Sequence, residues 1–198
     1  MDHPRPSRDA DHPFWDADRP APPPLTESDR LAAEELLGVA LPAALLDLLR
    51  EQDGGPVADG CGAFPTDRPT SWAPDHVPFD LLHGAGRHPQ VPFSLLDGPY
   101  LAAEWGLPPG LVPISGDGHH WIALDYRRCG PTGEPAVTWY DAESATELPL
   151  APGFAAFRRG LTSPDAFDDF DDLEALEALD ASDAAEPAAD RPPGPAAG

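Results

Sequence analysis

The stretch from residue 100 to residue 143 constrains the fold of this chain more than any other, because strand-forming runs and turn residues alternate along it. Gly116-Asp117-Gly118 is typical of the tight reversal that joins antiparallel strands. Pro113 favours an edge or irregular strand before this turn, since proline donates no ladder hydrogen bond. The stretch therefore predicts a meander of three strands over residues 111–115, 121–126 and 136–140.

The second of these strands carries apolar residues on both faces. Ile122 and Leu124 point to one side, whereas Trp121 and Ala123 point to the other, because side chains alternate along a strand. A strand with one solvated face would instead alternate apolar and polar residues. We therefore expect a central strand that is covered on both sides.

Helices are predicted on both sides of the meander in the sequence. The first follows Thr26, whose side chain can cap a helix that Gly38 ends in a left-handed turn. The second begins at Pro42, which suits a first helical turn, and carries a stripe of leucines. A closing helix is expected over residues 152–161, and long loops with one or two short strands over residues 56–98. This order indicates an α+β fold: a mainly antiparallel sheet with an N-terminal helix pair and a closing C-terminal helix.

Composition and charge divide the chain into three parts. We expect a disordered Pro/Asp-rich arm over residues 1–24, the α+β domain over residues 25–162, and an acidic, largely disordered tail over residues 163–198. The chain has 12 basic residues against 35 acidic ones, a formal net charge of −23. An anionic surface repels nucleic acid and anionic membranes and attracts cationic partners. These charges argue against nucleic acid and membranes as partners and favour a basic protein.

The tail admits two interpretations. Its aromatic and leucine residues recur at every third position with acidic residues between them, from Phe167 to Leu179. In one interpretation the tail stays solvated and disordered. In the other it is an acidic amphipathic segment that folds on a basic partner and imitates a phosphate backbone.

The sequence shows no feature of export or membrane insertion. No apolar run approaches the roughly 20 residues that cross a bilayer, and the first ten residues lack the apolar core of a signal peptide. Cys61 and Cys129 lie too far apart in the sequence to suggest a disulfide framework. We therefore expect a cytoplasmic protein.

Two sequence motifs in the predicted domain resemble those of a known protein family. The first is L-P-x-x-L-L-x-L-L-x-x-x-D-G-G at residues 41–55. The second is L-P-x-x-L-V-P-I-S-G-D-G-H-H-W-I-A-L-D-Y-R at residues 107–127, followed by E-P-A-V-T-W-Y-D-A-E at residues 134–143. Together they resemble the SUKH superfamily, the Smi/Knr-type proteins, over about residues 25–161. The resemblance implies an α+β fold without known catalysis. It also implies a role typical of bacterial members, which are immunity proteins that bind and neutralise polymorphic toxins, or of fungal members, which are regulatory scaffolds.

The histidines and carboxylates of the meander also invite enzymatic interpretations. A zinc site could draw on His119, His120 and Cys129, but adjacent histidines at a strand start point to opposite faces, and no Cys-x-x-Cys pair is present. A carboxylate pair for hydrolysis could come from several acidic residues, but acidic residues are so common here that no pair is singled out. The Gly116-Asp117-Gly118 turn lacks the Lys-Ser/Thr of a phosphate loop, and no Gly-x-Ser-x-Gly element is present. We predict no catalytic residue, no metal and no other cofactor.

The prediction is a non-enzymatic protein-binding module, an immunity protein for a basic toxin such as a nuclease. The main alternative is a regulatory scaffold or adaptor without a toxin partner, and a hydrolase comes third. Tryptophan, tyrosine and arginine dominate interface energies, and Trp72 stands in a loop where exposure is expected. The candidate partner-binding residues are Trp72, Glu104, Asp117, His119, His120, Asp125 and Glu143.

Overall fold

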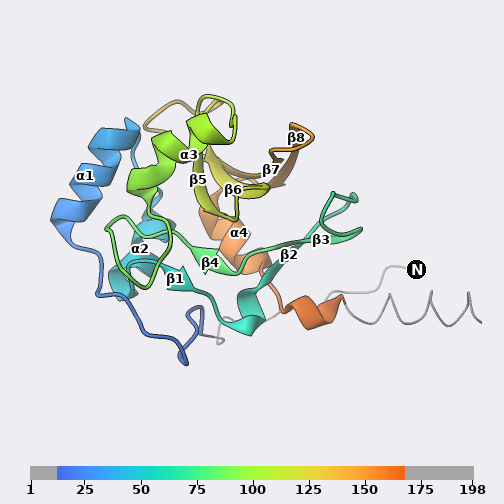
Figure 1. Ribbon diagram of the computed structural model, residues 1–198, viewed down its shortest axis with the longest axis horizontal. Coiled ribbons are helices and arrows are strands. Elements are labelled where there is room, and N and C mark those ends of the chain that lie inside the picture. The colour runs from blue at the N-terminus through green and yellow to red at the C-terminus, as the bar shows by residue number, and fades with distance from the viewer. Residues whose placement is uncertain (1–12, 168–198) are drawn as a thin grey trace, which may run out of the picture. The chain divides into compact units, whose positions relative to one another are not determined.

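A computed structural model describes residues 13–167 of the chain. The helices are α1 (Glu27–Leu37), α2 (Ala43–Glu51), α3 (Gly98–Glu104) and α4 (Phe154–Gly160), with short 3-10 turns at Asp59–Cys61, Leu95–Asp97 and Pro164–Ala166. The strands are β1 (Gly55–Pro56), β2 (Ala63–Pro65), β3 (His76–Pro78), β4 (Leu81–Leu82), β5 (Leu111–Gly116), β6 (His120–Asp125), β7 (Ala136–Asp141) and β8 (Thr146–Ala151). The predicted α+β class is therefore confirmed (Figure 1).

The main sheet is antiparallel, with its four strands in the order β5-β6-β7-β8. The predicted meander forms its first three strands, and a register shift between Pro113 and Ser115 makes β5 irregular, as its proline indicated. Strand β8 was not predicted, because Pro149 interrupts its pattern; as the last strand of the sheet, it tolerates the missing donor. Residues 56–98 contribute to two small sheets, β1-β4 and β2-β3, where one or two strands were expected.

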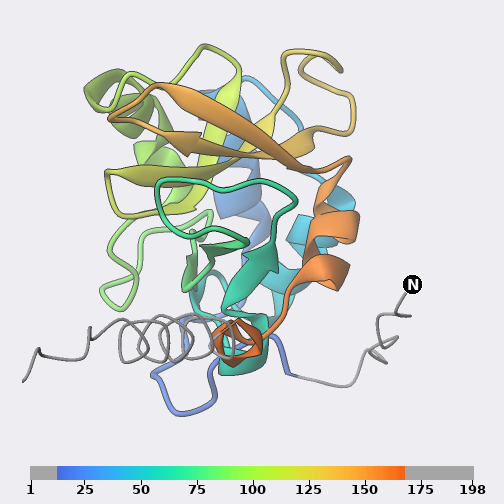
Figure 2. The same cartoon turned by 90° about the vertical axis from the view of Figure 1, so that its right-hand side faces the viewer.

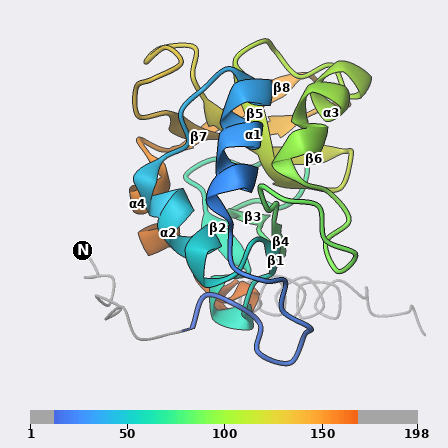
Figure 3. The ribbon, with the colours of Figure 1, turned by 90° about the vertical axis from the view of Figure 1, so that its left-hand side faces the viewer.

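Both faces of the main sheet are covered, as the pattern of β6 predicted. On one face, Ile122 and Leu124 join a large apolar cluster with residues of α2 and α4, including Phe157. On the other face, Trp121 packs in a second cluster that contains Leu101 of α3. Figure 3 shows α1 and α2 following each other along one side of the domain, with α4 beside α2.

The first two helices begin and end where their sequence signals predicted. The Thr26 hydroxyl accepts a hydrogen bond from the Asp29 amide at 3.2 Å, which caps α1. Gly38 ends α1 in the left-handed region at φ 68°, where a residue without a side chain is favoured. Pro42 directly precedes α2. Within residues 13–167, no helix combines the length and apolar character that crossing a bilayer requires.

The N-terminal arm differs from the expectation of disorder from residue 13 onward. Phe14 is buried and meets the edge of Trp15, with ring centroids 4.8 Å apart. Trp15 forms an isolated antiparallel bridge with Val57, and the Pro23 carbonyl accepts a hydrogen bond from the Asp53 amide at 3.1 Å. The overall composition of the arm does not reveal these two adjacent aromatic residues. Phe14 is buried in the core and Trp15 packs against it partly buried, so both hold this segment on the domain.

The predicted acidic tail begins close to a boundary between two compact units. Among the described residues, those up to 164 belong to one compact unit and those from 165 to 167 to a second. From residue 168 onward the tail lies outside the described residues. Both interpretations of the tail therefore stay predictions.

A buried carboxylate at the end of α2 links two distant parts of the domain. Asp53, the first residue of the D-G-G motif, accepts hydrogen bonds from the backbone amides of Ala85 and Gly86, each at 2.7 Å. His88 Nε2 lies 2.8 Å from the same carboxylate. A side chain at Gly84 would come within 2.2 Å of the Asp53 carbonyl oxygen, so the two segments are in direct backbone contact. Asp53 therefore fixes the loop that follows β4.

Candidate functional site

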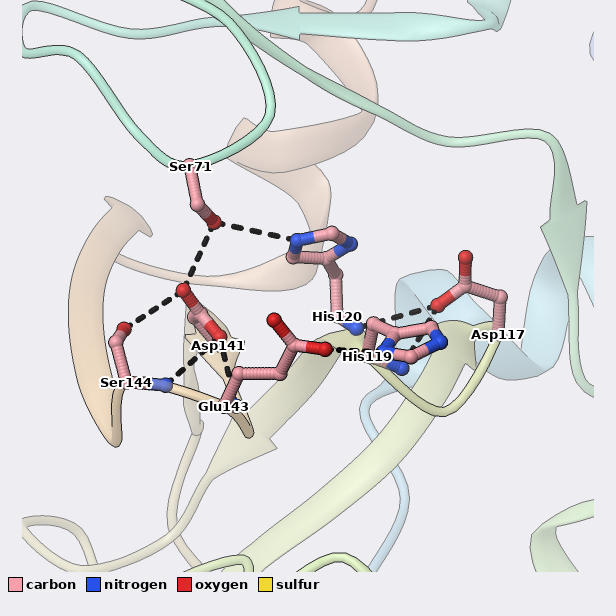
Figure 4. A network of polar contacts seen from close by, with 7 residues as sticks. All are labelled: Ser71, Asp117, His119, His120, Asp141, Glu143 and Ser144. Carbon is pink, nitrogen blue, oxygen red and sulfur yellow. Dashed lines mark hydrogen bonds and ion pairs between the residues drawn. The ribbon is translucent and has the colours of Figure 1, made fainter.

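The loop between β2 and β3 lies against the sheet where β6 begins and β7 ends (Figure 2). Antiparallel pairing sets His120 of β6 directly opposite Asp141 of β7. Ser71 of the loop reaches both residues: its hydroxyl donates to Asp141 Oδ2 at 2.8 Å, and its Oγ lies 3.2 Å from His120 Nε2 (Figure 4). These contacts join residues 49 to 70 positions apart in the sequence.

Asp141 is the centre of this polar network. Besides Ser71, its carboxylate accepts hydrogen bonds from the Ser144 hydroxyl at 2.7 Å and from the Glu143 amide at 2.8 Å. Burial opposes the ionised form, but the hydrogen bonds from Ser144 and Ser71 and from the backbone lower the pKa of Asp141 to about 2. Asp141 is therefore an ionised acceptor at neutral pH, and it holds both the loop and the β7–β8 turn.

This serine, histidine and carboxylate do not form a nucleophilic triad. In a triad the histidine lies between the serine and the carboxylate and removes the serine proton. Here Ser71 lies in the middle and its hydroxyl donates a hydrogen bond to Asp141, so the Ser71 oxygen is left to accept one from His120 Nε2. The arrangement anchors a loop and does not activate an oxygen.

The two adjacent histidines at the turn before β6 have different surroundings. The Asp117 carboxylate accepts hydrogen bonds from the amides of His119 at 3.0 Å and His120 at 3.2 Å. The His119 ring lies 2.8 Å from the Glu143 carboxylate, in an exposed pair of the kind that contributes little stability. The His120 ring instead stacks on Trp139, with centroids 5.5 Å apart. In the described part of the chain, no three histidine, cysteine or acidic side chains gather as metal ligands do.

A pocket of about 220 Å³ adjoins the network, and we call it the tryptophan pocket. Three tryptophans line it, of which Trp72 is 48 % exposed, whereas Trp121 and Trp139 are buried. Asp80, between β3 and β4, and Asp117 of the turn bring two carboxylates to its exposed side. The pocket therefore combines an aromatic floor with an acidic rim.

Within residues 13–167, the carboxylates of the tryptophan pocket form no ion pair. No arginine among these residues lines the pocket, whose lining includes one histidine, His120. Partial burial and the charge of Asp117 raise the pKa of Asp80. The rim thus holds two like charges that repel each other.

The structure brings five of the seven candidate residues to this one region. Trp72, Asp117 and His120 line the tryptophan pocket. His119, which forms an ion pair with Glu143, directly precedes His120 in the chain (Figure 4). The other two lie elsewhere. Glu104 is exposed at the end of α3.

Asp125 lies at the opposite end of β6 from His120. Its carboxylate forms an ion pair with Arg127 at 2.7 Å, and Arg127 also pairs with Glu147 of β8 at 2.7 Å. Hydrogen bonds from the Arg127 guanidinium are the main cause of the lowered pKa of Asp125. Asp125 therefore ties β6 to β8 and takes no part in the pocket.

Sequence reasoning did not select three residues of the site. Asp141 was considered only among the acidic residues that could supply a carboxylate pair for hydrolysis, although the pairing of residues 121–126 with 136–140 places it opposite His120. Ser71 and Asp80 come from residues 56–98, where proline and glycine hide any periodic pattern. No local signal in the sequence marks either residue.

Loss of the Ser71 hydroxyl is expected to loosen the loop. We expect Ser71→Ala to lower the free energy of unfolding by about 1 kcal/mol, because one buried acceptor loses a donor. Amide hydrogen exchange at residues 70–73 should become faster. Ser144→Ala is the matched control, because it removes another hydroxyl from the same carboxylate and leaves the loop anchor in place. Equal exchange in the two variants would contradict the anchoring role.

Comparison with known proteins gives one result at the level of the family. The family model described as SMI1 / KNR4 family (SUKH-1) matches residues 24–160. No curated protein matches the chain. The matched residues include the helices α1 to α4, the four strands of the main sheet and all residues that line the tryptophan pocket.

Proposed function

The chain belongs to the SMI1/KNR4 (SUKH-1) family, and from this premise we propose that it is a non-enzymatic protein-binding module. Its partner is a cognate toxin with a basic surface, such as a nuclease, and the chain neutralises that toxin as an immunity protein. Binding blocks the toxin's active site or the path of its substrate. No reaction is assigned to the chain itself.

The observation that carries this proposal is an exposed tryptophan beside carboxylates without internal cations. Trp72 keeps 48 % of its surface accessible although it belongs to a hydrogen-bonded loop. Tryptophan is enriched among the few residues that carry most of the binding energy at protein interfaces. The formal net charge of −23 adds a long-range attraction for a basic partner.

Co-expression tests the proposal in cells. A toxin module encoded beside this gene is expressed with the chain, without it, or with the Asp53→Ala variant, which is expected to be destabilised. We expect growth to be restored only by the intact chain, and the toxin to purify with it. Growth arrest with no complex would overturn the proposal. A stable complex with a host protein that is not a toxin would favour the regulatory scaffold instead.

Association with the toxin is expected to depend strongly on salt. Electrostatic steering accelerates the encounter of opposite charges and is screened as ionic strength rises. We expect the association rate constant to fall by roughly tenfold or more between low and high salt. Stopped-flow or surface-based kinetics measures this directly. A rate constant that does not change with salt would show that the acidic surface does not steer binding.

A further inference from the structure

The tryptophan pocket has a size and chemistry that suit one side chain of a partner. Its volume of about 220 Å³ lies below the roughly 300–1,000 Å³ of pockets that hold drug-sized ligands. Its walls are mostly apolar and aromatic, with Trp72 on the exposed side and Trp139 and Ile122 buried. Its acidic groups are Asp80 and Asp117, and Ser115 and His120 add further polar atoms to its lining. An occupant therefore needs an apolar stem and a cationic head.

We propose that the tryptophan pocket receives an arginine side chain of the partner protein, held between Trp72 and the carboxylates of Asp80 and Asp117. This inference rests on the proposed function, because it names the group by which the toxin would be anchored.

The choice of arginine follows from the aromatic walls. A guanidinium is planar and weakly hydrated, so it stacks on tryptophan faces and forms paired hydrogen bonds with a carboxylate. A lysine ammonium is a compact, strongly hydrated charge and loses more on leaving water. The stem of an arginine also covers apolar surface while its head stays at the acidic rim. Tryptophan and carboxylate together therefore favour arginine over lysine.

Other classes of occupant fit the pocket poorly. A phosphate or a carboxylate would meet the two acidic side chains of the rim and be repelled. A purely apolar group would displace water from these carboxylates without replacing the hydrogen bonds that the water makes, which costs free energy. A cation, in contrast, relieves the repulsion between Asp80 and Asp117, which adds to the effect of partial burial in raising the pKa of Asp80. The two carboxylates at the rim therefore favour a cationic occupant over an anionic or apolar one.

A small-molecule titration tests the pocket without the toxin. The probe is N-acetyl-arginine amide, added to the full chain at constant ionic strength while the indole N–H signals of the five tryptophans are followed by NMR. We expect saturable shifts of the Trp72 and Trp139 signals, with a dissociation constant of roughly millimolar order. N-acetyl-lysine amide should bind several-fold more weakly. Equal binding of the two probes, or shifts no larger than those from sodium chloride, would overturn the assignment.

Matched variants test whether the arginine probe binds at the tryptophan pocket. Asp80→Asn keeps the shape of the side chain and removes its charge, and we expect it to weaken arginine binding by roughly tenfold. Trp72→Ala should do the same, whereas Tyr100→Ala and Asp47→Asn, which change an exposed aromatic residue and an exposed carboxylate outside the pocket, should not. Equal loss in the control variants would contradict the pocket.

The same variants separate this inference from the proposed function. If Asp80→Asn and Trp72→Ala remain folded and still bind the toxin at full strength, the arginine anchor is wrong while the immunity role stands. If the titration succeeds but no toxin binds the intact chain, the pocket stands and its partner is of another kind.

Discussion

Replacing Asp53 with alanine is expected to lower the free energy of unfolding by about 2–6 kcal/mol, because the change leaves two buried backbone donors without an acceptor. The carboxylate is buried and accepts hydrogen bonds from the amides of Ala85 and Gly86, with His88 as a third partner. Without it, two buried backbone donors lose their acceptor, and each unsatisfied donor costs about 1–3 kcal/mol. Chemical denaturation at neutral pH measures the change.

Two further variants identify the cause of this loss. Asp53→Asn keeps the volume and one acceptor oxygen but turns an N–H₂ group toward a backbone donor, so we expect an intermediate loss. Asp47→Ala removes an exposed carboxylate from α2, and we expect a change within about 0.5 kcal/mol. If Asp53→Ala is no more destabilising than Asp47→Ala, the buried carboxylate does not hold the loop.

Asp53 also shows the limit of what the sequence could predict. Its D-G-G motif correctly indicated the end of a helix, because turn chemistry is local. Its hydrogen-bond partners lie 32 to 35 residues further along the chain, in a segment without periodicity. A motif can therefore mark where a helix ends while the reason for its aspartate depends on tertiary contacts.

The residues of the candidate site also fall into those that local sequence patterns could predict and those that depend on tertiary contacts. The turn residues Asp117 and His120 were found because a hairpin brings neighbours in sequence together, and the exposure of Trp72 followed from its loop. Asp125 lies on the same strand as His120, but a strand rises about 3.3 Å per residue, so the two residues lie at opposite ends of β6. Asp80 joins the pocket through the packing of short strands, which no pattern in residues 56–98 indicates.

Stability is expected to fall by about 3 kcal/mol as the pH drops from 6.5 to 4, because of one buried histidine. His83 is fully buried beside Phe93 and Trp121, and its Nδ1 lies 3.3 Å from the Pro113 carbonyl oxygen. Burial lowers the pKa of His83 from 6.5 to about 4, although the Pro113 carbonyl and the charge of Asp97 oppose this shift. The unfolded chain therefore takes up a proton at a higher pH than the folded domain does.

The sign of the effect follows from this difference. Above pH 6.5 the histidine is neutral in both states, so the full stability is present. As the pH falls, protonation favours the unfolded chain, and the loss is complete once the pH passes the folded pKa of about 4. Asp141 acts in a lower window, because its lowered pKa of about 2 removes stability only as the pH falls below its ordinary value of 3.8. The two groups can therefore be separated by pH.

Urea denaturation at pH 7.5, 5.5 and 4.5 measures this dependence in the parent chain and in two variants. His83→Phe replaces the titrating ring with an apolar one of similar size, and we expect it to remove most of the loss between pH 7.5 and 4.5. His119→Gln changes an exposed histidine and keeps His83, so the dependence should remain. If His83→Phe loses as much stability as the parent over this range, other groups account for the acid sensitivity and the buried ring does not.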